Sequence, residues 1–251
     1  MTVFEIVAPL LECDYDDDFA ALDAYHGGIG IINNSTGYTI TLNYDAYPSF
    51  TEAILPQVIT LPNGTKDLQW SNQGRVFIYA GINTSYWYTA MDQMAVINGN
   101  QFNSYISWIK SYNASFPWYN IWSVYDDWPG NMLLPNHECF NFIWESLTFL
   151  HGQGVTIIPA KARTSFIALF ASQKPTKVDY NDPTVRSNII SFYEDMNDEL
   201  NELGLLGFMD ILMQMVFYPT FYVRDNNDYY QLDLWDPWVG TLYVKVPTPG
   251  H

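Results

Sequence analysis

The order of hydrophobic and polar positions along the chain predicts both strands and helices. Short apolar runs rich in β-branched and aromatic residues are typical of strands, and they occur in "TVFEIVAP", "HGGIGII", "YTITLNY", "GRVFIYAGI" and "TLYVKV". The turn-forming residues "NNSTG" separate the second run from the third. We therefore expect these two runs to form a β-hairpin.

Apolar residues three and four positions apart, which form one face of a helix, predict helices over 100–112, 139–151 and 183–204. The apolar face of the second helix consists of Phe140, Ile143, Trp144, Leu147 and Leu150. Residues 113–135 are rich in Trp, Asn, Asp and Pro and are interpreted as a long loop. The segment 162–172 is interpreted as a helix or a buried strand.

The chain shows no repeat and no clear domain boundary, so the pattern predicts one α+β domain over residues 1–251. Its most apolar stretch is 203–223. A helix that crosses a bilayer needs about 20 apolar residues, and Asp210 and Pro219 interrupt this one. Two interpretations remain open, a core helix and a helix near 203–218 that lies in a membrane interface or lines a lipid groove.

Charge and cysteine usage exclude several classes of protein. The chain has 27 acidic and 10 basic residues, a formal net charge of −17. This argues against a nucleic-acid surface, which needs clustered cations, and it fits an acidic compartment such as the lysosome. Cys13 and Cys139 cannot build a disulfide framework, although a single bridge between them is conceivable. The histidines are scattered without zinc-site spacing, so we expect no metal and no organic cofactor.

Five Asn-x-Ser/Thr sequons favour the secretory pathway. They lie at Asn33, Asn34, Asn63, Asn83 and Asn113. The first residues, "MTVFE", lack the basic and apolar regions of a signal peptide. We therefore expect that a presequence is absent from this chain.

The segment "LLPNHECFNFIWESLTFL" contains the first candidate for chemistry, Cys139, at the start of a predicted helix. The positive end of a helix dipole favours a thiolate, which is the nucleophilic form of cysteine. Asn136 is the expected N-cap, with His137 and Glu138 in the first turn. The alternative interpretation is a small thiol packed in the core.

A nucleophilic cysteine needs an imidazole and a third group that orients the imidazole. His26 opens the glycine-rich strand "HGGIG", where small residues allow a helix or a substrate to approach closely. Asn43 lies on one face of the next strand and is predicted to accept the ring N–H. The candidate triad is therefore Cys139, His26 and Asn43, with a structural histidine as the alternative. His137 is too close to Cys139 in the chain to pair with it.

Several segments, in the same order along the chain, resemble the ceroid-lipofuscinosis neuronal protein 5 family of lysosomal enzymes. They are "VFEIVAP", "HGGIG" with "STGYT", "WSNQGRVFIYAGI", "AVINGNQFNSYISWIK", "YNIWSV", "HECFNFIWESLTFL" and "FYPTFYV". The strand histidine and the helix cysteine are also similar to those of lipid acyltransferases and NlpC-type enzymes. The resemblance implies a permuted papain-like fold, in which an antiparallel sheet packs against a helix that starts at the nucleophilic cysteine.

The resemblance places the family's histidine on His26 and its cysteine on Cys139. The third member, a glutamate in the best-known relatives, falls on Asn43. The result is a Cys-His-Asn set, as in papain, in which a neutral amide orients the ring without supplying charge. The relatives' additional disulfide-forming cysteines are missing from this chain.

The activity implied by the resemblance is lysosomal acyl transfer through an acyl-thioester on the cysteine. The family is described as a bis(monoacylglycero)phosphate synthase, which moves an acyl chain between lysophosphatidylglycerol molecules, and as a palmitoyl-protein thioesterase. Water resolves the acyl-enzyme by hydrolysis and a glycerol hydroxyl resolves it by transfer. An acyl lipid or an acylated cysteine is the expected substrate, with peripheral membrane contact through 203–218 and no nucleic-acid partner.

Further groups are expected around such a site. Backbone N–H groups at the start of the cysteine helix, with Asn72 or Gln73, would stabilise an oxyanion. Arg75, Lys161 and Arg163 are candidates for an anionic phospholipid, or else ordinary surface cations.

Two other functions compete with the enzyme hypothesis. The first is a binding or sorting module that kept the fold but lost the chemistry. The second is a glycoside hydrolase, which needs two carboxylates flanking a sugar. Carboxylates such as Asp126 and Asp127 are plentiful, but no spacing identifies a pair.

Overall fold

The computed structural model describes residues 1–9, 25–47, 55–71, 73–115, 118–120, 122–125, 132–134, 137–158, 161–164, 167–170, 176–203, 220–225, 227–233 and 242–245. The apolar runs near the start of the chain form a five-stranded antiparallel sheet in the order β6-β3-β2-β1-β7. Its strands are β1 (Thr2–Pro9), β2 (Tyr25–Ile32), β3 (Thr39–Tyr47), β6 (Gln73–Ala80) and β7 (Ala90–Val96). The expected hairpin over "NNSTG" is confirmed, because β2 and β3 pair from Ile29↔Leu42 to Ile32↔Thr39.

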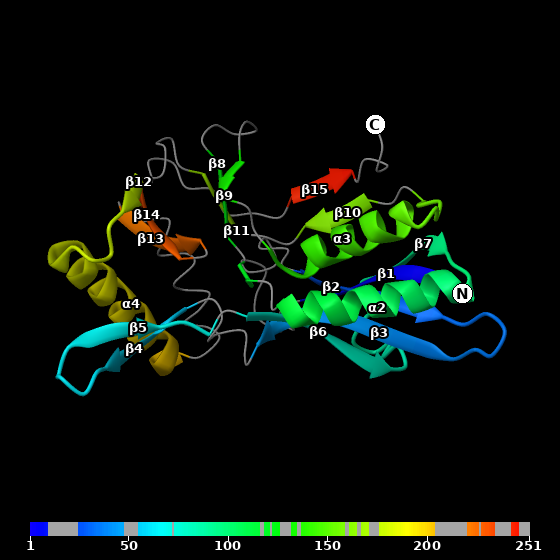
Figure 1. Cartoon of the computed structure of the whole chain (residues 1–251), viewed down its shortest axis with the longest axis horizontal. Helices are drawn as coiled ribbons and strands as arrows, with labels where there is room; N and C mark the ends of the chain where they lie inside the picture. The colour runs from blue at the N-terminus through cyan, green and yellow to red at the C-terminus, as the bar shows by residue number, and fades with distance from the viewer. Residues whose placement is uncertain are drawn as a thin grey trace.

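Two helices pack on one face of this sheet, α2 (Gly99–Ser115) and α3 (Cys139–Gly152), as Figure 1 shows. Alternate residues of the strands, such as Val7 and Ile29, face the helices and join Phe142 and Leu147 of α3 in the core. Each large side chain buried in this way contributes roughly 1.5–3 kcal/mol of transfer free energy. On the opposite face of the sheet, the described residues form a small apolar cluster that includes Trp87.

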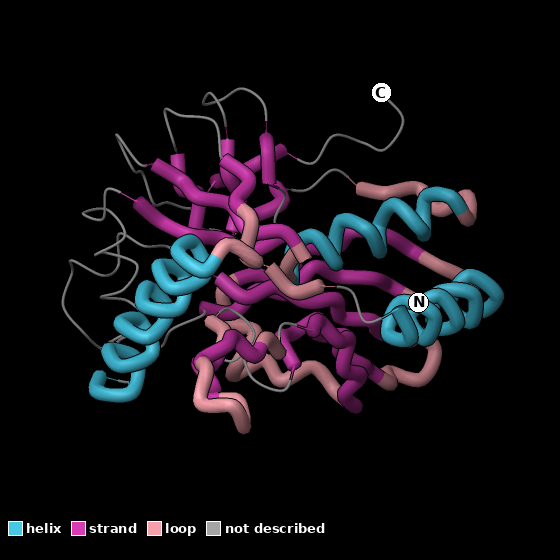
Figure 2. Tube along the Cα trace, turned by 60° about the vertical axis from the view of Figure 1, so that its left-hand side comes forward, coloured by secondary structure: helices cyan, strands magenta, loops and turns pink. Residues whose placement is uncertain are grey.

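The second half of the molecule is built around α4 (Pro183–Leu203). This helix packs beside the hairpin of β4 (Gln57–Thr60) and β5 (Lys66–Gln69), and the sheet β12-β14-β13 lies next to it (Figures 1 and 2). The sheet consists of β12 (Thr176–Val178), β14 (Asp228–Asp233) and β13 (Thr220–Asp225). Residues such as Tyr193 and Val223 continue the same hydrophobic core into this half.

Two small sheets complete the described structure. In the first, β8 (Trp122–Tyr125) pairs in parallel with β11 (Ile167–Phe170) and antiparallel with β9 (Met132–Leu134). In the second, β10 (Lys161–Thr164) pairs with β15 (Leu242–Lys245). The described chain is therefore a mixed α/β structure with mostly antiparallel sheets.

Some sequence predictions need correction. The stretch 113–135 is not one long loop, because it contains β8 and β9, which are too short to show a period of their own. For the segment 162–172 the strand alternative holds and the helix does not, because the segment contributes to the two strands β10 and β11. On α3, Phe142 is fully buried whereas Trp144 is 38% exposed, so the inward face is rotated relative to the predicted one.

The single-domain prediction and the lipid-groove prediction for 203–218 remain open. Leu203 ends α4, and the rest of that interval lies outside the described residues. Among the helices that the structure describes, none combines the length and the apolar character needed to cross a bilayer.

Tyr44 of β3 is fully buried at the centre of an aromatic cluster between the sheet and the helices. Its ring stacks on Tyr119 and Phe142, each at a centroid distance of 5.7 Å. Its hydroxyl lies 3.0 Å from His137 Nδ1. A glycine on β6 makes room for this hydroxyl, since a Cβ at Gly74 would lie 1.6 Å from it.

We predict that Gly74→Ala destabilises the protein by about 1–3 kcal/mol, the usual cost of overpacking a filled core. The added methyl must displace the Tyr44 hydroxyl from His137. Urea unfolding of the variant measures this cost. Gly99→Ala is the matched control, because a Cβ at Gly99 meets no atom within 4 Å, and its free energy of unfolding should be unchanged or slightly higher. Equal stability of the two variants would contradict the role given to Gly74.

Candidate active site

The glycine-rich start of β2 exposes its two faces to different partners. A Cβ on Gly27 would lie 2.8 Å from side-chain atoms of both Ile143 and Phe140, so this residue faces α3. A Cβ on Gly28 would lie 3.0 Å from Trp87, on the opposite face. The His26 ring stacks on Trp87 as well, with centroids 5.5 Å apart. The expected close approach of a helix to "HGGIG" therefore occurs at Gly27.

His26 and Asn43 contact each other across the β2–β3 hairpin. His26 Nε2 lies 2.5 Å from Asn43 Oδ1. Because the amide oxygen can only accept, Nε2 carries the hydrogen and Nδ1 keeps the lone pair of a neutral ring. Burial lowers the pKa of His26, and the charge of Asp45 and the hydrogen bond to Asn43 partly offset this effect. The pair thus has the tautomer that a general base needs.

Helix α3 begins at Cys139, and its N-cap is Glu138 rather than the expected Asn136, which lies outside the described residues. The Glu138 side chain accepts from the N–H of Phe140 at 3.0 Å and the Asn141 side chain accepts from the Glu138 N–H, a capping box. Glu138 is almost completely buried. The cap therefore places a carboxyl group directly beside the cysteine.

The Cys139 sulfur occupies the gap where β2 and β3 stop pairing. Its thiol lies 3.4 Å from the Gly27 backbone nitrogen, which donates to it, and 3.0 Å from Glu138 Oε2, to which it donates. The β2–β3 ladder starts only at Ile29, so the Gly27 N–H is available for the sulfur. Cys139 is a free thiol and is 4% exposed. A disulfide between Cys13 and Cys139 is therefore not formed.

The electrostatics of the site keep this thiol protonated. Burial and the neighbouring Glu138 carboxylate raise the pKa of Cys139 well above its usual range, although the Gly27 N–H acts in the opposite direction. Burial also raises the pKa of Glu138 to about 7. The sequence predicted a thiolate favoured by the helix dipole. That dipole amounts to about half a charge, and a full carboxylate in contact with a desolvated sulfur outweighs it.

The structure thus brings the three predicted residues into one region through two separate contacts. His26 bonds to Asn43, and the sulfur bonds to the amide that directly follows His26 in the chain. The thiol donates to Glu138 and not to the imidazole. The imidazole stacks on Trp87, on the face of the sheet opposite α3, so a Cys–His pair would require both side chains to leave the contacts described here.

The helix start offers fewer free N–H groups than expected, because Glu138 already accepts from Phe140 and Asn141. The Cys139 N–H donates to no other described residue, so it is the remaining candidate for an oxyanion donor at this helix start. Asn72 lies outside the described residues. Gln73 is exposed, and its backbone bridges to Trp118.

The predicted substrate cations have different surroundings. Arg75 lies opposite Asp45 in the β3–β6 ladder, and its guanidinium is 5.5 Å from the centre of the Tyr47 ring. The backbones of Lys161 and Arg163 belong to β10, and their side chains lie outside the described residues.

His137 has a larger structural role than the sequence suggested. Its Nδ1 lies 3.0 Å from the Tyr44 hydroxyl, its Nε2 lies 2.9 Å from the Tyr112 hydroxyl, and Glu145 is 3.4 Å from Nε2. Its backbone also pairs with Asn120. These contacts join β3, α2 and α3 directly behind the Cys139 turn. No spacing in the sequence could have revealed them.

Four of the five sequons lie in turns, where Asn34, Asn63 and Asn83 are exposed and Asn33 is partly so. Asn113 differs, because its side chain bonds to both the N–H and the carbonyl of Val76 at 2.7 Å. A glycan on its amide nitrogen would break the second of these bonds. Glycosylation at the other four sites stays a prediction.

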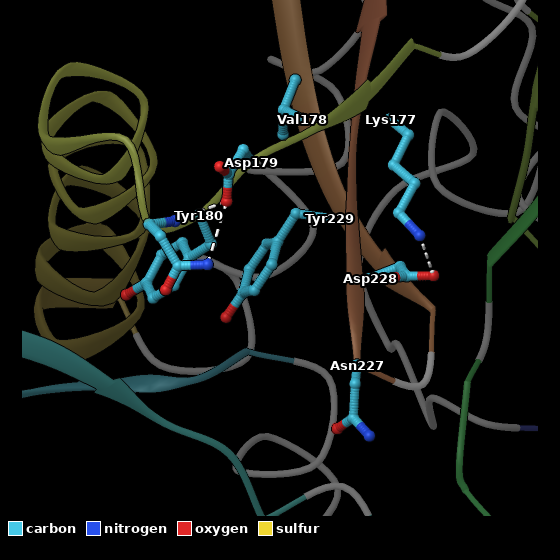
Figure 3. Close-up of a pocket in the computed structure, with 8 residues that line it drawn as sticks. Lys177, Val178, Asp179, Tyr180, Asn227, Asp228 and Tyr229 are labelled. Atoms are coloured by element: carbon cyan, nitrogen blue, oxygen red, sulfur yellow. Dashed lines mark hydrogen bonds and ion pairs between the residues drawn. The ribbon is translucent and has the colours of Figure 1, made fainter.

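A surface pocket lies in the other half of the molecule, beside β12 and β14. Figure 3 shows the stacked rings of Tyr180 and Tyr229 and the ion pair between Lys177 and Asp228 that line it. In the described part of the chain, no cluster of three or more His, Cys, Asp or Glu side chains is arranged to hold a metal ion.

Comparison with known proteins identifies the family. The family described as ceroid-lipofuscinosis neuronal protein 5 matches residues 1–249. The Dictyostelium discoideum "Ceroid-lipofuscinosis neuronal protein 5 homolog" is 28% identical over 255 residues, which cover 99% of this chain and 77% of that protein. "Cln5-like protein 2" of the same organism is 29% identical over 259 residues, covering 98% and 79%.

A human protein is also similar. It is named "Bis(monoacylglycero)phosphate synthase CLN5" and is 24% identical over 263 residues, which cover 98% of this chain and 72% of the human protein. Because the family match extends over nearly all 251 residues, this chain belongs to the ceroid-lipofuscinosis neuronal protein 5 family.

Proposed function

We propose that this protein is a cysteine-dependent acyltransferase that makes bis(monoacylglycero)phosphate from lysophosphatidylglycerol in the lysosome. Mammalian relatives carry the name of this synthase, which supports a lipid substrate. The observation that carries the chemistry is the 2.5 Å contact between His26 and Asn43, next to the amide that holds the Cys139 sulfur. The acidic composition and the exposed sequons support a lysosomal glycoprotein.

The same arrangement supports a permuted papain-like fold of the NlpC type. A helix starts at the cysteine and packs on an antiparallel sheet whose strands supply the histidine and the asparagine. The histidine strand precedes the cysteine helix in the chain, which is the permuted order.

In the proposed first step, the thiol leaves Glu138 and transfers its proton to Nδ1 of His26. The thiolate attacks the acyl carbonyl of the donor lipid, forming a C–S bond, and the imidazolium protonates the departing glycerol oxygen as the C–O bond breaks. The N–H of Cys139 stabilises the oxyanion. In the second step a hydroxyl of another lysophosphatidylglycerol gives its proton to Nδ1 and attacks the thioester, forming a C–O bond as the C–S bond breaks. The departing thiolate takes this proton back from the imidazolium, which restores the free thiol.

Palmitoyl-protein thioesterase activity would use the same acyl-enzyme. The donor would then be an acylated cysteine, and water would replace the lipid hydroxyl in the second step.

Glu138 is proposed to make this chemistry dependent on acidic pH. As a carboxylate it accepts the thiol proton and repels a thiolate. When protonated it becomes a donor, and together with the Gly27 N–H it would stabilise the thiolate. His137, Tyr44, Tyr119 and Cys139 are the titratable groups that interact with it.

Cys139→Ser is expected to abolish acyl transfer. The wild-type protein and the variant are incubated with lysophosphatidylglycerol at pH 5, and the diacylated product is measured by mass spectrometry. An S-palmitoyl peptide tests hydrolysis in parallel. Loss of product of about 100-fold or more supports the acyl-enzyme. Equal turnover by both proteins, or turnover by neither, would instead favour a binding or sorting module.

Glu138→Gln is expected to remove a pH dependence of activity while keeping the helix cap, because the amide oxygen still accepts from Phe140. Wild-type activity should fall as the pH rises through about 7, where Glu138 ionises. At pH 8 the variant should be at least about tenfold more active than the wild type, since removal of one contacting like charge lowers a pKa by about one unit or more. Identical pH profiles would contradict the proposal.

The same variant tests the pKa of Glu138 independently of activity. The folded pKa of about 7 lies above the ordinary value of 4.5, so folded protein binds more protons than unfolded protein between these pH values. Its contribution to stability is complete below pH 4.5 and is lost as the pH rises through 7. Between pH 4 and pH 8, wild-type stability should fall by about 3 kcal/mol relative to the variant.

Asn43→Glu is expected to raise the pKa of His26, because a carboxylate in place of the amide would pair with the imidazolium. The rise should be about one unit or more. The chain has four histidines, so the ring signals of His26 can be resolved and followed by NMR titration. The control is the same substitution at an exposed asparagine, Asn83→Glu. Asn113→Glu would not serve, because the Asn113 side chain accepts from the Val76 N–H. An unchanged His26 titration would show that the two side chains are not in contact.

A further inference from the structure

Arg224 of β13 is surrounded by aromatic rings. Its Cζ lies 4.9 Å from the centre of the Trp70 ring, 4.6 Å from Trp118 and 5.8 Å from Tyr229. The two indole centroids are only 6.5 Å apart, so the rings form a corner around the guanidinium and do not sandwich it. One side of the cation is therefore not covered by these indoles.

Two hydrogen-bond donors in this corner have no acceptor in the part of the chain that the structure describes. Arg224 Nη2 donates to Asn227 Oδ1 at 3.1 Å, but Arg224 Nε is buried and has no hydrogen-bond partner among the described residues. The same holds for Trp118 Nε1. Trp70 Nε1, in contrast, donates to the Tyr229 hydroxyl at 2.8 Å. Each unpaired buried donor costs about 1–3 kcal/mol, so two on neighbouring side chains indicate a missing acceptor.

The charge of Arg224 is equally uncompensated. Lys66, Lys177 and Arg186 each form an ion pair with a carboxylate, whereas Arg224 forms none with any residue that the structure describes. Burial lowers the pKa of the Arg224 guanidinium, yet an arginine stays protonated at any physiological pH. Arg75 also forms no ion pair with a described residue, so what distinguishes Arg224 is that its unpaired Nε is buried.

Arg186 shows what a merely structural arginine looks like in the same half of the molecule. Its guanidinium lies 5.3 Å from the centre of the Tyr180 ring, a contact of the same kind as those of Arg224. It also lies 3.1 Å from the Asp67 carboxylate and donates to the Lys66 carbonyl. The aromatic contact is shared by the two arginines, and the missing anion distinguishes Arg224.

The corner lies beside the surface pocket and is also linked through the backbone to the candidate active site at Cys139. Asn227 and Tyr229, which contact Arg224, line the surface pocket of Figure 3. On the other side, Trp118 belongs to the segment 118–120, whose last residue pairs with His137. His137 precedes Cys139 by two residues. The backbone path from Trp118 to Cys139 is thus at most roughly 20 Å long.

We propose that Arg224, with the indole N–H of Trp118, binds the oxyanion of a phosphate ester in the corner formed by Trp70 and Trp118. A tetrahedral phosphate has enough oxygens to accept from both donors at once, and guanidinium suits it better than ammonium. The choice of phosphate rests on the proposed function, whose substrate is a phosphodiester lipid. The existence of an anion site does not rest on it.

Binding is measured by calorimetry in the Cys139→Ser protein, so that turnover cannot interfere. The probes are inorganic phosphate, glycerol 3-phosphate, glycerophosphoglycerol and monomeric lysophosphatidylglycerol, at constant ionic strength. Arg224→Met keeps the length and the apolar contacts but removes the charge. Trp118→Phe keeps the ring but removes the N–H. Arg186→Met is the matched control, and circular dichroism checks the folding of each variant.

We expect Arg224→Met to weaken phosphate-ester binding by at least tenfold, Trp118→Phe to weaken it by about three- to tenfold, and Arg186→Met to leave it within twofold. A free-phosphate site would bind inorganic phosphate as tightly as the diesters, whereas a headgroup site would prefer them. If Arg224→Met does not fold, Trp118→Phe decides the question. Absence of binding by all probes, or equal binding by Arg224→Met, overturns the site. Binding that persists while the wild type lacks acyl transfer would refute the proposed function alone.

Discussion

The contact between the Cys139 sulfur and the Gly27 amide is the constraint on which the site depends. It is possible only because Gly27 has no side chain, since a Cβ there would lie 2.8 Å from Ile143 and Phe140 and would push α3 off the sheet. It also requires the β2–β3 ladder to stop at Ile29, which leaves one strand N–H free for the sulfur. The packing of the core helix and the position of the thiol are therefore one property of the fold. A change that moved α3 would move the sulfur with it.

The carboxyl group of Glu138 links helix capping to the state of the thiol. Serine, threonine, asparagine and aspartate are the usual N-cap residues, because a short side chain reaches the first N–H groups easily. Glutamate here accepts from those groups and from the thiol at once, and it is buried while doing so. Burial is what brings its pKa to about 7. An exposed glutamate at the N-cap would have a pKa near its ordinary value of 4.5. It would then be ionised in both weakly acidic and neutral surroundings, and its charge could not differ between them.

Much of the sheet and part of the site could be predicted from the sequence, because both depend on local patterns. The turn residues between two β-rich runs gave the hairpin, and alternation along β3 put Asn43 on the face that meets His26. The helix start at Cys139 followed from apolar spacing. The strands β8 and β9 were missed because three or four residues among turn-forming neighbours carry no period. The capping role of Glu138 was missed because glutamate is not a usual N-cap residue, although its partners Phe140 and Asn141 are local. The tyrosine partners of His137 are distant in the chain, and no local pattern reveals them.

The segment 118–120 shows why the long-range part matters. Trp118 lies against Arg224, Tyr119 stacks on Tyr44, and Asn120 pairs with His137 next to the cysteine turn. Three consecutive residues thus connect the aromatic corner of one half of the molecule to the helix start in the other. Tyr119 is buried between them, so the segment cannot shift at one end without disturbing the packing at the other. An anion held at Arg224 and an acyl group at Cys139 would therefore be connected by one buried piece of backbone, so a shift at one of the two proposed sites would be transmitted to the other.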